Sequence, residues 1–407
     1  MKIRSITYFL NPGYPVDEEG LRKAGKFITS ARPAFESAGY EVQTARLASV
    51  PYPLLLPDLQ AERVVDFSCQ LERDAQAQGY DYISIGPALP SSPQSYPLIP
   101  EVLAATKNVF LSGQLTIGKG CVSLPAVQLC AEVIQRSASI SSDGFANLRF
   151  AALANVPAGA PFFPAAYHAG DKPCFALATE AADLAVEVFS QTTALDEAGL
   201  QLTQQIEAHA GKLALIGNKL EQDFGLSFGG IDFTLAPFPE VGRSIGTAIE
   251  LLGVPAVGFH GSLAATAFLT SVIDRAKFKR TGFCGIFLPV LEDAVLASRA
   301  AEGKLSVNDL LLYSAVCGTG LDTIPLGGNV TVEELNGVLL DLAVLAVRLD
   351  KPLTARLMPI PGKKAGDLTG FDFAYFANSR ILDIKACGLV GLLVEGDMLR
   401  VPALRER

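Results

Sequence analysis

Two side chains that can take part in chemistry, Cys317 and Asp322, lie five positions apart in a glycine-rich stretch. Residues 314–329 read Ser-Ala-Val-Cys-Gly-Thr-Gly-Leu-Asp-Thr-Ile-Pro-Leu-Gly-Gly-Asn. Glycine and proline at this density favour neither a helix nor the interior of a strand, so we predict a constrained loop after a helical run over residues 309–316. Such loops between apolar segments often carry binding and catalytic residues. We therefore predict a functional site here, with Cys317 as a thiol and Asp322 as a base, a ligand or a substrate anchor.

A pattern of glycine, a bulky apolar residue and aspartate recurs, and it ends at Asp232, Asp322 and Asp372. An aspartate after a glycine turn often caps a backbone N–H group, and this structural role is one interpretation. Aspartates from different loops can instead share a divalent cation or an acid–base task. No thiol–imidazole cluster accompanies them, so Asp232 and Asp322 would suit Mg²⁺ or Ca²⁺ better than zinc. Both are candidate catalytic residues and candidate metal ligands.

Histidine is scarce in this chain, and two of its three histidines lie in candidate site loops. His168 ends a proline-rich and aromatic loop near residues 155–170, and it is a candidate catalytic residue. His260 precedes Gly-Ser and is a candidate substrate ligand. Such a histidine is often a hydrogen-bonded structural group, which is the alternative for both. Cys317 also has an alternative role, because a free cysteine is often an inert buried thiol.

Three arginines are candidate substrate-binding residues. Arg149 lies in a predicted strand, where a charge must be paired or must face a cavity. Arg243 lies beside a predicted helix start, where backbone N–H groups already favour an anion. Together with Arg356, these residues permit an anionic substrate without requiring one.

Composition limits the classes of protein to which the chain can belong. With 407 residues, of which 49% are hydrophobic and 18% charged, it can bury a large core. The formal net charge of -9 argues against a nucleic-acid surface, and no apolar run approaches the ~20 residues of a membrane span. Residues 1–10 lead directly into Asn-Pro-Gly, so no signal peptide is expected. Seven cysteines without a CxxC pair indicate a reduced, cytosolic protein.

The elements that must position these residues alternate between strands and helices. In the first part of the chain we predict strands over residues 2–10, 41–47, 82–85, 108–111 and 147–152, and helices over residues 16–37, 61–78, 101–106 and 124–137. In the second part we predict helices over residues 180–210 and 244–252, strands over residues 283–288 and 353–357, and two helices that begin after the capping residues Ser306 and Thr331. This alternation is typical of parallel strands with helices packed outside. No linker interrupts it, so we predict a single α/β domain over residues 1–407.

Several runs of residues occur together and in a fixed order. They are Asn11-Pro-Gly-Tyr-Pro15, Asn147-Leu-Arg-Phe-Ala-Ala152, Pro161-Phe-Phe-Pro-Ala-Ala-Tyr-His168, Gly230-Ile-Asp-Phe-Thr-Leu-Ala-Pro237, Val316-Cys-Gly-Thr-Gly-Leu-Asp-Thr-Ile-Pro325 and Ala355-Arg-Leu-Met-Pro-Ile-Pro-Gly362. Over almost the whole chain, this set resembles the bacterial and archaeal family called domain-of-unknown-function 711. The resemblance implies a closed barrel of about ten strands with outer helices and a loop projecting inside, similar to pyruvate formate-lyase and ribonucleotide reductase. In those relatives the inner loop carries the catalytic cysteine, so Cys317 is its expected occupant by analogy, although a shared fold does not transfer a reaction.

The expected function follows from these residues and from the implied barrel. We expect a non-radical cytosolic enzyme that acts on a small anionic metabolite in a barrel-interior pocket lined by the Cys317–Asp322 loop. The alternative is a non-catalytic small-molecule or metal-binding protein, and a homodimer is a further hypothesis. Glycyl-radical chemistry is not expected, because residues 386–396 contain glycines but no Arg-Val-x-Gly-Tyr-like signature. We expect no nucleic-acid and no membrane partner.

Overall fold

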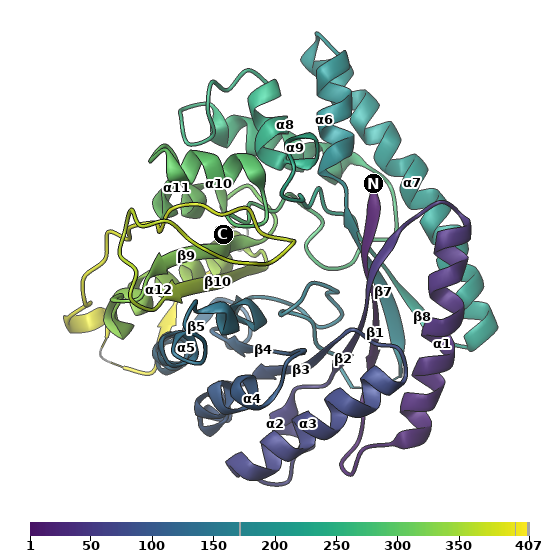
Figure 1. The fold of residues 1–407 in the computed structure, drawn as a ribbon, viewed down its shortest axis with the longest axis vertical. Helices are drawn as coiled ribbons and strands as arrows, with labels where there is room; N and C mark the ends of the chain where they lie inside the picture. The colour runs from purple at the N-terminus through teal and green to yellow at the C-terminus, as the bar shows by residue number, and fades with distance from the viewer. Residues whose placement is uncertain (171, 395, 405–407) are drawn as a thin grey trace.

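The computed structural model describes residues 1–170, 172–394 and 396–404. Within these residues, nine strands form one sheet in the order β8-β7-β1-β2-β3-β4-β6-β10-β9 (Figure 1). The parallel centre of the sheet consists of β1 (Lys2–Leu10), β2 (Val42–Ser49), β3 (Tyr82–Ala88), β4 (Val109–Gln114) and β6 (Phe150–Ala154). The flanking pairs β7 (Cys174–Glu180) with β8 (Ser227–Asp232), and β10 (Leu353–Ile360) with β9 (Gly320–Gly327), run antiparallel to this centre. The chain is therefore a mixed α/β protein.

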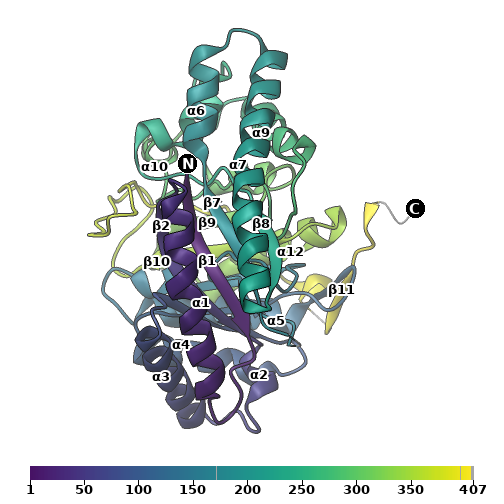
Figure 2. The same ribbon diagram turned by 90° about the vertical axis from the view of Figure 1, so that its right-hand side faces the viewer.

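Helices cover the outer side of the curved sheet (Figure 1). They include α1 (Glu18–Ser37), α3 (Ala61–Ala77), α4 (Ile99–Ala105), α5 (Leu124–Ala138), α7 (Leu195–Phe224) and α12 (Val332–Leu349). Helices α1 and α7 lie side by side over the region of β1, β7 and β8 (Figures 1 and 2). Helix α1 buries Leu21, Ala24, Ile28 and Phe35, because a spacing of three and four places these residues on one helical face. No helix among the described residues is long and apolar enough to cross a membrane.

Further elements lie between β8 and β9 in the sequence. They are α8 (Ile245–Leu251), α9 (Ser262–Arg275), α10 (Ala294–Ala301) and α11 (Val307–Tyr313). The predicted capping boxes are confirmed, since Ser306 accepts a hydrogen bond from the backbone N–H of Asp309 and Thr331 accepts one from that of Glu334. These two contacts fix the starts of α11 and α12.

The predicted long helix over residues 180–210 is wrong in part, because it is interrupted and its first residue belongs to a strand. Residues Cys174–Glu180 form β7, and the helical part is split into α6 (Ala182–Gln191) and α7. At the break Thr192 adopts an extended conformation, and its hydroxyl donates to the carbonyl of Val188 at 2.9 Å. Backbone dihedrals in the β region cannot continue the α-helical hydrogen-bond pattern, so α6 ends before this residue.

The predicted loop over residues 314–329 is also wrong in part, because Gly320–Gly327 is strand β9. It lies at the end of the nine-strand order, where proline and glycine are tolerated since one side of the strand needs no regular ladder. Its pairing with β10 shifts register between Ala355 and Leu357. Near this irregularity Thr323 has a φ of 43°, a left-handed conformation that is rare for a β-branched residue.

The strands predicted over residues 147–152 and 283–288 need correction. A 3₁₀ helix, Phe145–Arg149, precedes β6, so Arg149 ends a turn and does not lie in a strand. Residues 279–290 form no regular strand but bridge both edges of the sheet. The backbone N–H of Ile231 donates to Lys279 and that of Leu235 to Gly285, while Gly318 donates to Ile286 and Val290 to Asp322, at 2.8–3.2 Å. One irregular segment therefore connects the β8 edge to the β9 edge.

The loop over residues 155–170 packs against the inner faces of the first strands. Thr7 of β1 donates to the carbonyl of Pro161 at 3.4 Å, and Ser84 of β3 donates to that of Ala166 at 2.7 Å. The backbone N–H of His168 donates to Ser49 of β2 at 2.9 Å. We call residues 155–170 the inner loop.

Candidate functional site

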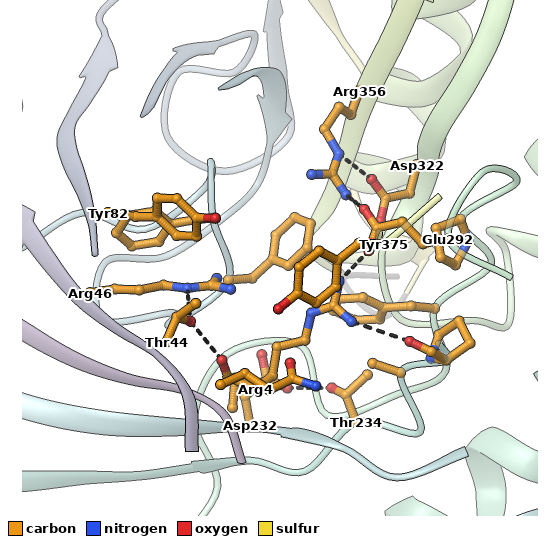
Figure 3. Close-up of a pocket in the computed structure, with 18 of the residues that line it drawn as sticks. Arg4, Thr44, Arg46, Tyr82, Asp232, Thr234, Glu292, Asp322, Arg356 and Tyr375 are labelled. Carbon is orange, nitrogen blue, oxygen red and sulfur yellow. Dashed lines mark hydrogen bonds and ion pairs between the residues drawn. The ribbon is translucent and has the colours of Figure 1, made fainter. Parts of the chain in front are cut away.

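A cavity of about 880 Å³, including its open mouth, lies on the inner side of the sheet (Figure 3). Strands supply most of its polar walls, with Arg4 from β1, Arg46 from β2, Tyr82 from β3, Asp232 from β8 and Arg356 from β10. The inner loop supplies aromatic side chains, as does the segment after β10. Residues on alternate positions of a strand face the same side, so Thr44 and Arg46 both line the cavity.

Buried ion pairs form one wall of the cavity. Arg356 Nε donates to Asp322 Oδ1 at 2.6 Å, and its Nη2 donates to Glu292 Oε1 at 2.7 Å. The other oxygen of Glu292 pairs with Arg4. Arg4 also pairs with Glu180 at 3.2 Å, just outside the cavity lining. The guanidinium groups of Arg4 and Arg356 therefore each have two carboxylate partners.

The two carboxylates that share Arg356 differ in their proton affinity. Burial favours the neutral form of Glu292, but Arg356 and Arg4 outweigh it and lower its pKa. Burial and the neighbouring Glu292 raise the pKa of Asp322, and Arg356 offsets only part of this rise. Of these two carboxylates, Glu292 is thus the firmly ionised one, because it pairs with both Arg4 and Arg356 whereas Asp322 pairs with Arg356.

Arg46 is in a different electrostatic situation. Its Nε donates to Thr44 Oγ1 at 2.9 Å, and its guanidinium carbon lies 5.8 Å from the centre of the Tyr82 ring and 5.2 Å from that of Phe163. It makes no ion pair with any residue that the structure describes. Burial and the neighbouring Arg4 lower its pKa to about 10, so the group remains positively charged near neutral pH. Arg46 is half-buried, and a partly desolvated cation without a counterion attracts an anion.

Asp232 lies at the end of β8 and is held by three donors. Its Oδ1 accepts the backbone N–H of Cys284 at 2.7 Å and the hydroxyl of Thr234 at 2.7 Å, while its Oδ2 accepts the backbone N–H of Phe283 at 3.1 Å. Burial nevertheless raises the pKa of Asp232. A carboxylate offers about four acceptor positions, so one remains on Oδ2 for a substrate proton.

Glycine is required at position 282 for this arrangement. Gly282 has a φ of +67°, and a Cβ built on it would overlap Oδ2 of Asp232. The turn therefore brings the backbone N–H groups of Phe283 and Cys284 onto the carboxylate without a side chain between them.

Three predicted site residues, Asp232, Asp322 and Arg356, come together around the cavity. Cys317 does not line it, although only 1% of the residue is exposed. It lies in the main hydrophobic core, and its carbonyl accepts a hydrogen bond from Lys351. The catalytic role of Cys317 stays a prediction, but any contact with a ligand in this cavity would need a rearrangement.

The predicted histidines lie away from the cavity lining. His168 is buried on the inner loop, and its ring centre lies 6.4 Å from that of Phe9. His260 is exposed just before α9. Asp372, the third aspartate of the recurring pattern, is exposed as well. The structure therefore does not place these three side chains with Asp232.

The other two predicted arginines have structural contacts. Arg149 donates to the carbonyls of Leu103 at 2.6 Å and Thr106 at 2.9 Å, so it holds the end of α4, and burial lowers its pKa to about 10. Arg243 pairs with Glu180 and lies 4.0 Å from the centre of the Phe238 ring. Arg243 therefore contacts the ion-pair cluster through Glu180, and it does not line the cavity.

The metal hypothesis finds little support in the donor set. No group of three or more histidine, cysteine, aspartate or glutamate side chains within the described residues is placed to hold a metal ion. Protein donors occupy most acceptor positions of Asp232, and Arg356 binds Asp322. These contacts leave few free protein oxygens, whereas Ca²⁺ takes about six to eight oxygen ligands and Mg²⁺ usually binds through one or two carboxylates.

Sequence reasoning missed several residues of the site. Arg4 and Arg46 lie inside predicted strands, and the argument applied to Arg149, that a charge in a strand must be paired or face a cavity, could have found them. Glu292 and Tyr375 come from irregular segments, and no local pattern marks them. Their position depends on contacts between distant parts of the chain.

Comparison with known proteins places the chain among relatives. A model of the family described as Uncharacterised ACR (DUF711) matches residues 1–374. A UPF0210 protein of Pyrobaculum arsenaticum is 32% identical over 358 residues, which cover 83% of this chain and 78% of the relative. Another of Pyrobaculum aerophilum is 32% identical over 392 residues, covering 91% and 86%. The predicted resemblance is confirmed: the chain belongs to the family described as Uncharacterised ACR (DUF711).

Proposed function

We propose that this protein is a non-radical enzyme that binds a small anionic metabolite in the cavity. The observation that carries this proposal is the positively charged Arg46, which lines the cavity and has no ion-pair partner among the described residues. Arg4 and Arg356 line the same cavity but are already paired with carboxylates. An anionic substrate would supply the counterion that Arg46 lacks.

Asp232 is the proposed general acid or base. Its carboxyl group lines the same cavity, and burial raises its pKa above the ordinary value, so it is a stronger base than an exposed aspartate. The three hydrogen bonds from Phe283, Cys284 and Thr234 hold its orientation. Arg46 would then bind the substrate, and Asp232 would move a proton on it.

The architecture and location that we propose are consistent with such an enzyme. The sheet would close through residues 279–290 into a barrel similar to that of pyruvate formate-lyase, and the hydrogen bonds from this segment to both edges support closure. Residues 155–170, in place of the loop with Cys317 that the sequence led us to expect, would be the loop that projects into it. A cytosolic location is proposed because the seven cysteines are all free thiols.

The proposal is tested by binding measurements on matched variants. Wild-type protein, Arg46→Met and Arg63→Met are screened against a panel of small carboxylates and phosphates by isothermal titration calorimetry. Arg63 is a suitable control because it is exposed and lies outside the cavity lining. We expect the wild type and Arg63→Met to bind the same anions, and Arg46→Met to lose at least about tenfold in affinity. Equal affinity of Arg46→Met and the wild type would overturn the proposal.

Two alternatives, a non-catalytic binding protein and a metal-binding protein, give different results with the same purified proteins. A non-catalytic binding protein would bind the anion through Arg46 but leave it unchanged after prolonged incubation, as followed by mass spectrometry. An enzyme would convert it, and Asp232→Asn would stop the conversion while anion binding persists. A metal-binding protein would carry stoichiometric magnesium or calcium in elemental analysis, and Asp232→Asn would lower that content.

A further inference from the structure

We propose that the anion bound at Arg46 is the single carboxylate of a flat, aromatic or conjugated molecule. This inference rests on the proposed function and specifies its substrate class. It follows from three features of the cavity: the number of uncompensated charges, the geometry of the free donors and the kind of surface that surrounds them.

The charge balance favours a monoanion. The ion-pair cluster contains three guanidinium and three carboxylate groups that pair with one another: half-buried Arg4 and Arg243 and buried Arg356 with the buried Glu180, Glu292 and Asp322. On its surface side Arg243 also lies 3.6 Å from the exposed Glu240. Asp232 also lines the cavity, but its hydrogen-bond donors are uncharged and burial raises its pKa, which favours the neutral form. Arg46 is thus the one cation of this cavity that has no ion-pair partner among the described residues. A dianion such as a phosphate monoester would bring a second negative charge close to Glu292 and Asp322, which is unfavourable where solvent is excluded.

The free donors fit the shape of a carboxylate. Only Nε of Arg46 has a hydrogen-bond partner in the described part of the chain, so the two terminal nitrogens present an open fork. A guanidinium fork binds the two oxygens of a carboxylate through parallel hydrogen bonds. The phenol groups of Tyr82 and Tyr375 also make no hydrogen bond to residues that the structure describes, and Figure 3 shows both oxygens directed toward the space beside Arg46. They can donate to the same carboxylate or to a polar group on its carrier.

The rest of the lining suits a flat apolar body. The aromatic residues of the cavity are Tyr82, Phe110, Phe162, Phe163, Phe287 and Phe373, together with Tyr375. Edge-to-face contacts join Tyr82 to Phe110 and Phe110 to Phe163, with ring centres 5.1 Å and 5.4 Å apart. Phe162 and Phe287 form another such pair at 5.0 Å. Aromatic walls of this kind present both ring faces and ring edges, and a planar ligand can pack against either. Saturated polyols would find few hydrogen-bond partners on them.

The test compares four simple probes that differ in one property each. Benzoate is a flat monoanion, cyclohexanecarboxylate a puckered monoanion, phenyl phosphate an aromatic dianion near neutral pH, and benzamide the neutral counterpart of benzoate. Affinities for the full-length protein are measured by ligand-observed NMR with wild type, Arg46→Met and the control Arg63→Met. Tyr375→Phe is included because it removes one phenol group and leaves the ring.

We expect benzoate to bind at least about tenfold more tightly than each of the other three probes. Arg46→Met should abolish the advantage of benzoate over benzamide, and Tyr375→Phe should weaken benzoate binding by about threefold without changing the melting temperature. If phenyl phosphate or cyclohexanecarboxylate binds through Arg46 as tightly as benzoate, the inference is overturned while the proposed function survives. If no anion binds, or if Arg46→Met binds them all like the wild type, both are overturned.

Discussion

Arg46 and Arg356 line the same cavity, but Arg356 has two carboxylate partners and Arg46 has none among the described residues. Asp322 and Glu292 hold Arg356 at 2.6 Å and 2.7 Å. Thr44 and two aromatic rings surround Arg46. Arg356 therefore belongs to the part of the site that stabilises the fold, and Arg46 to the part that can bind a ligand.

The two arginines should therefore differ in their contribution to stability. Arg356→Met leaves Glu292 and Asp322 buried with less compensation, so we expect it to lower the free energy of unfolding by about 3–5 kcal/mol. Arg46→Met removes a half-buried cation that has no counterion among the described residues, and we expect no loss or a gain of about 1 kcal/mol. Urea unfolding of both variants at neutral pH measures the difference. An equal loss in both variants would contradict the assignment of Arg46 as the free cation.

Gly282 should be essential because of its contact with Asp232. In Gly282→Ala the new Cβ would overlap Oδ2 of Asp232, and the φ of +67° adds backbone strain. Gly303→Ala is the matched control, since Gly303 has a φ of +72° but no heavy atom within 4 Å of the added Cβ. We expect Gly303→Ala to cost about 1 kcal/mol of unfolding free energy and Gly282→Ala at least about 2 kcal/mol more. Similar losses of unfolding free energy in the two variants would show that Asp232 can move away from the added Cβ without an energetic cost.

Much of the sheet could be predicted from the sequence, because buried parallel strands are continuous apolar runs between amphipathic helices. The strand predicted over residues 2–10 is confirmed by β1, and the capping boxes before α11 and α12 are confirmed as well. Strand β9 was not predictable in this way, because an edge strand tolerates the glycines and the proline that usually indicate a loop.

The candidate site could be predicted only in part. A carboxylate after a glycine turn indicated Asp232 and Asp322, and the structure places both in the cavity wall. Whether an arginine is paired depends on residues far away in the sequence: Arg356 and Glu292 are 64 positions apart. No local pattern distinguishes Arg356 from Arg46, so only the structure shows that Arg46 has no ion-pair partner among the described residues.

The raised pKa of Asp232 predicts a specific pH dependence. Because its pKa is higher in the folded state than its ordinary value of 3.8, the folded protein binds this proton more tightly than the unfolded chain. The stability contributed by Asp232 is therefore present at low pH and decreases as the pH rises from 3.8 through the raised pKa. Asp232→Asn lacks this term, so the difference in unfolding free energy between wild type and variant should fall over this window and then become constant.

Urea unfolding of both proteins across the acidic range checks this expectation. The other buried carboxylates, including Asp322 and Glu292, are common to both proteins, so their titration cancels in the difference to the extent that they do not interact with Asp232. A difference that increases with pH would show that the hydrogen bonds from Phe283, Cys284 and Thr234 outweigh burial and lower the pKa of Asp232.

Cys317 and Asp322 should have separate roles, although they are close in sequence. Cys317 lies in the hydrophobic core, so Cys317→Ser buries a hydroxyl group there and should cost about 1–2 kcal/mol of unfolding free energy. Because the side chain does not line the cavity, the affinity for the anion should stay within about twofold of the wild type. Asp322 lines the cavity, and Asp322→Asn removes the charge that pairs with Arg356. The affinity for the anion should therefore change by at least about fivefold. Calorimetric titration of both variants with an anion bound by the wild type, alongside their melting temperatures, tests this. A large loss of affinity in Cys317→Ser with an unchanged melting temperature would show instead that the thiol takes part in ligand binding.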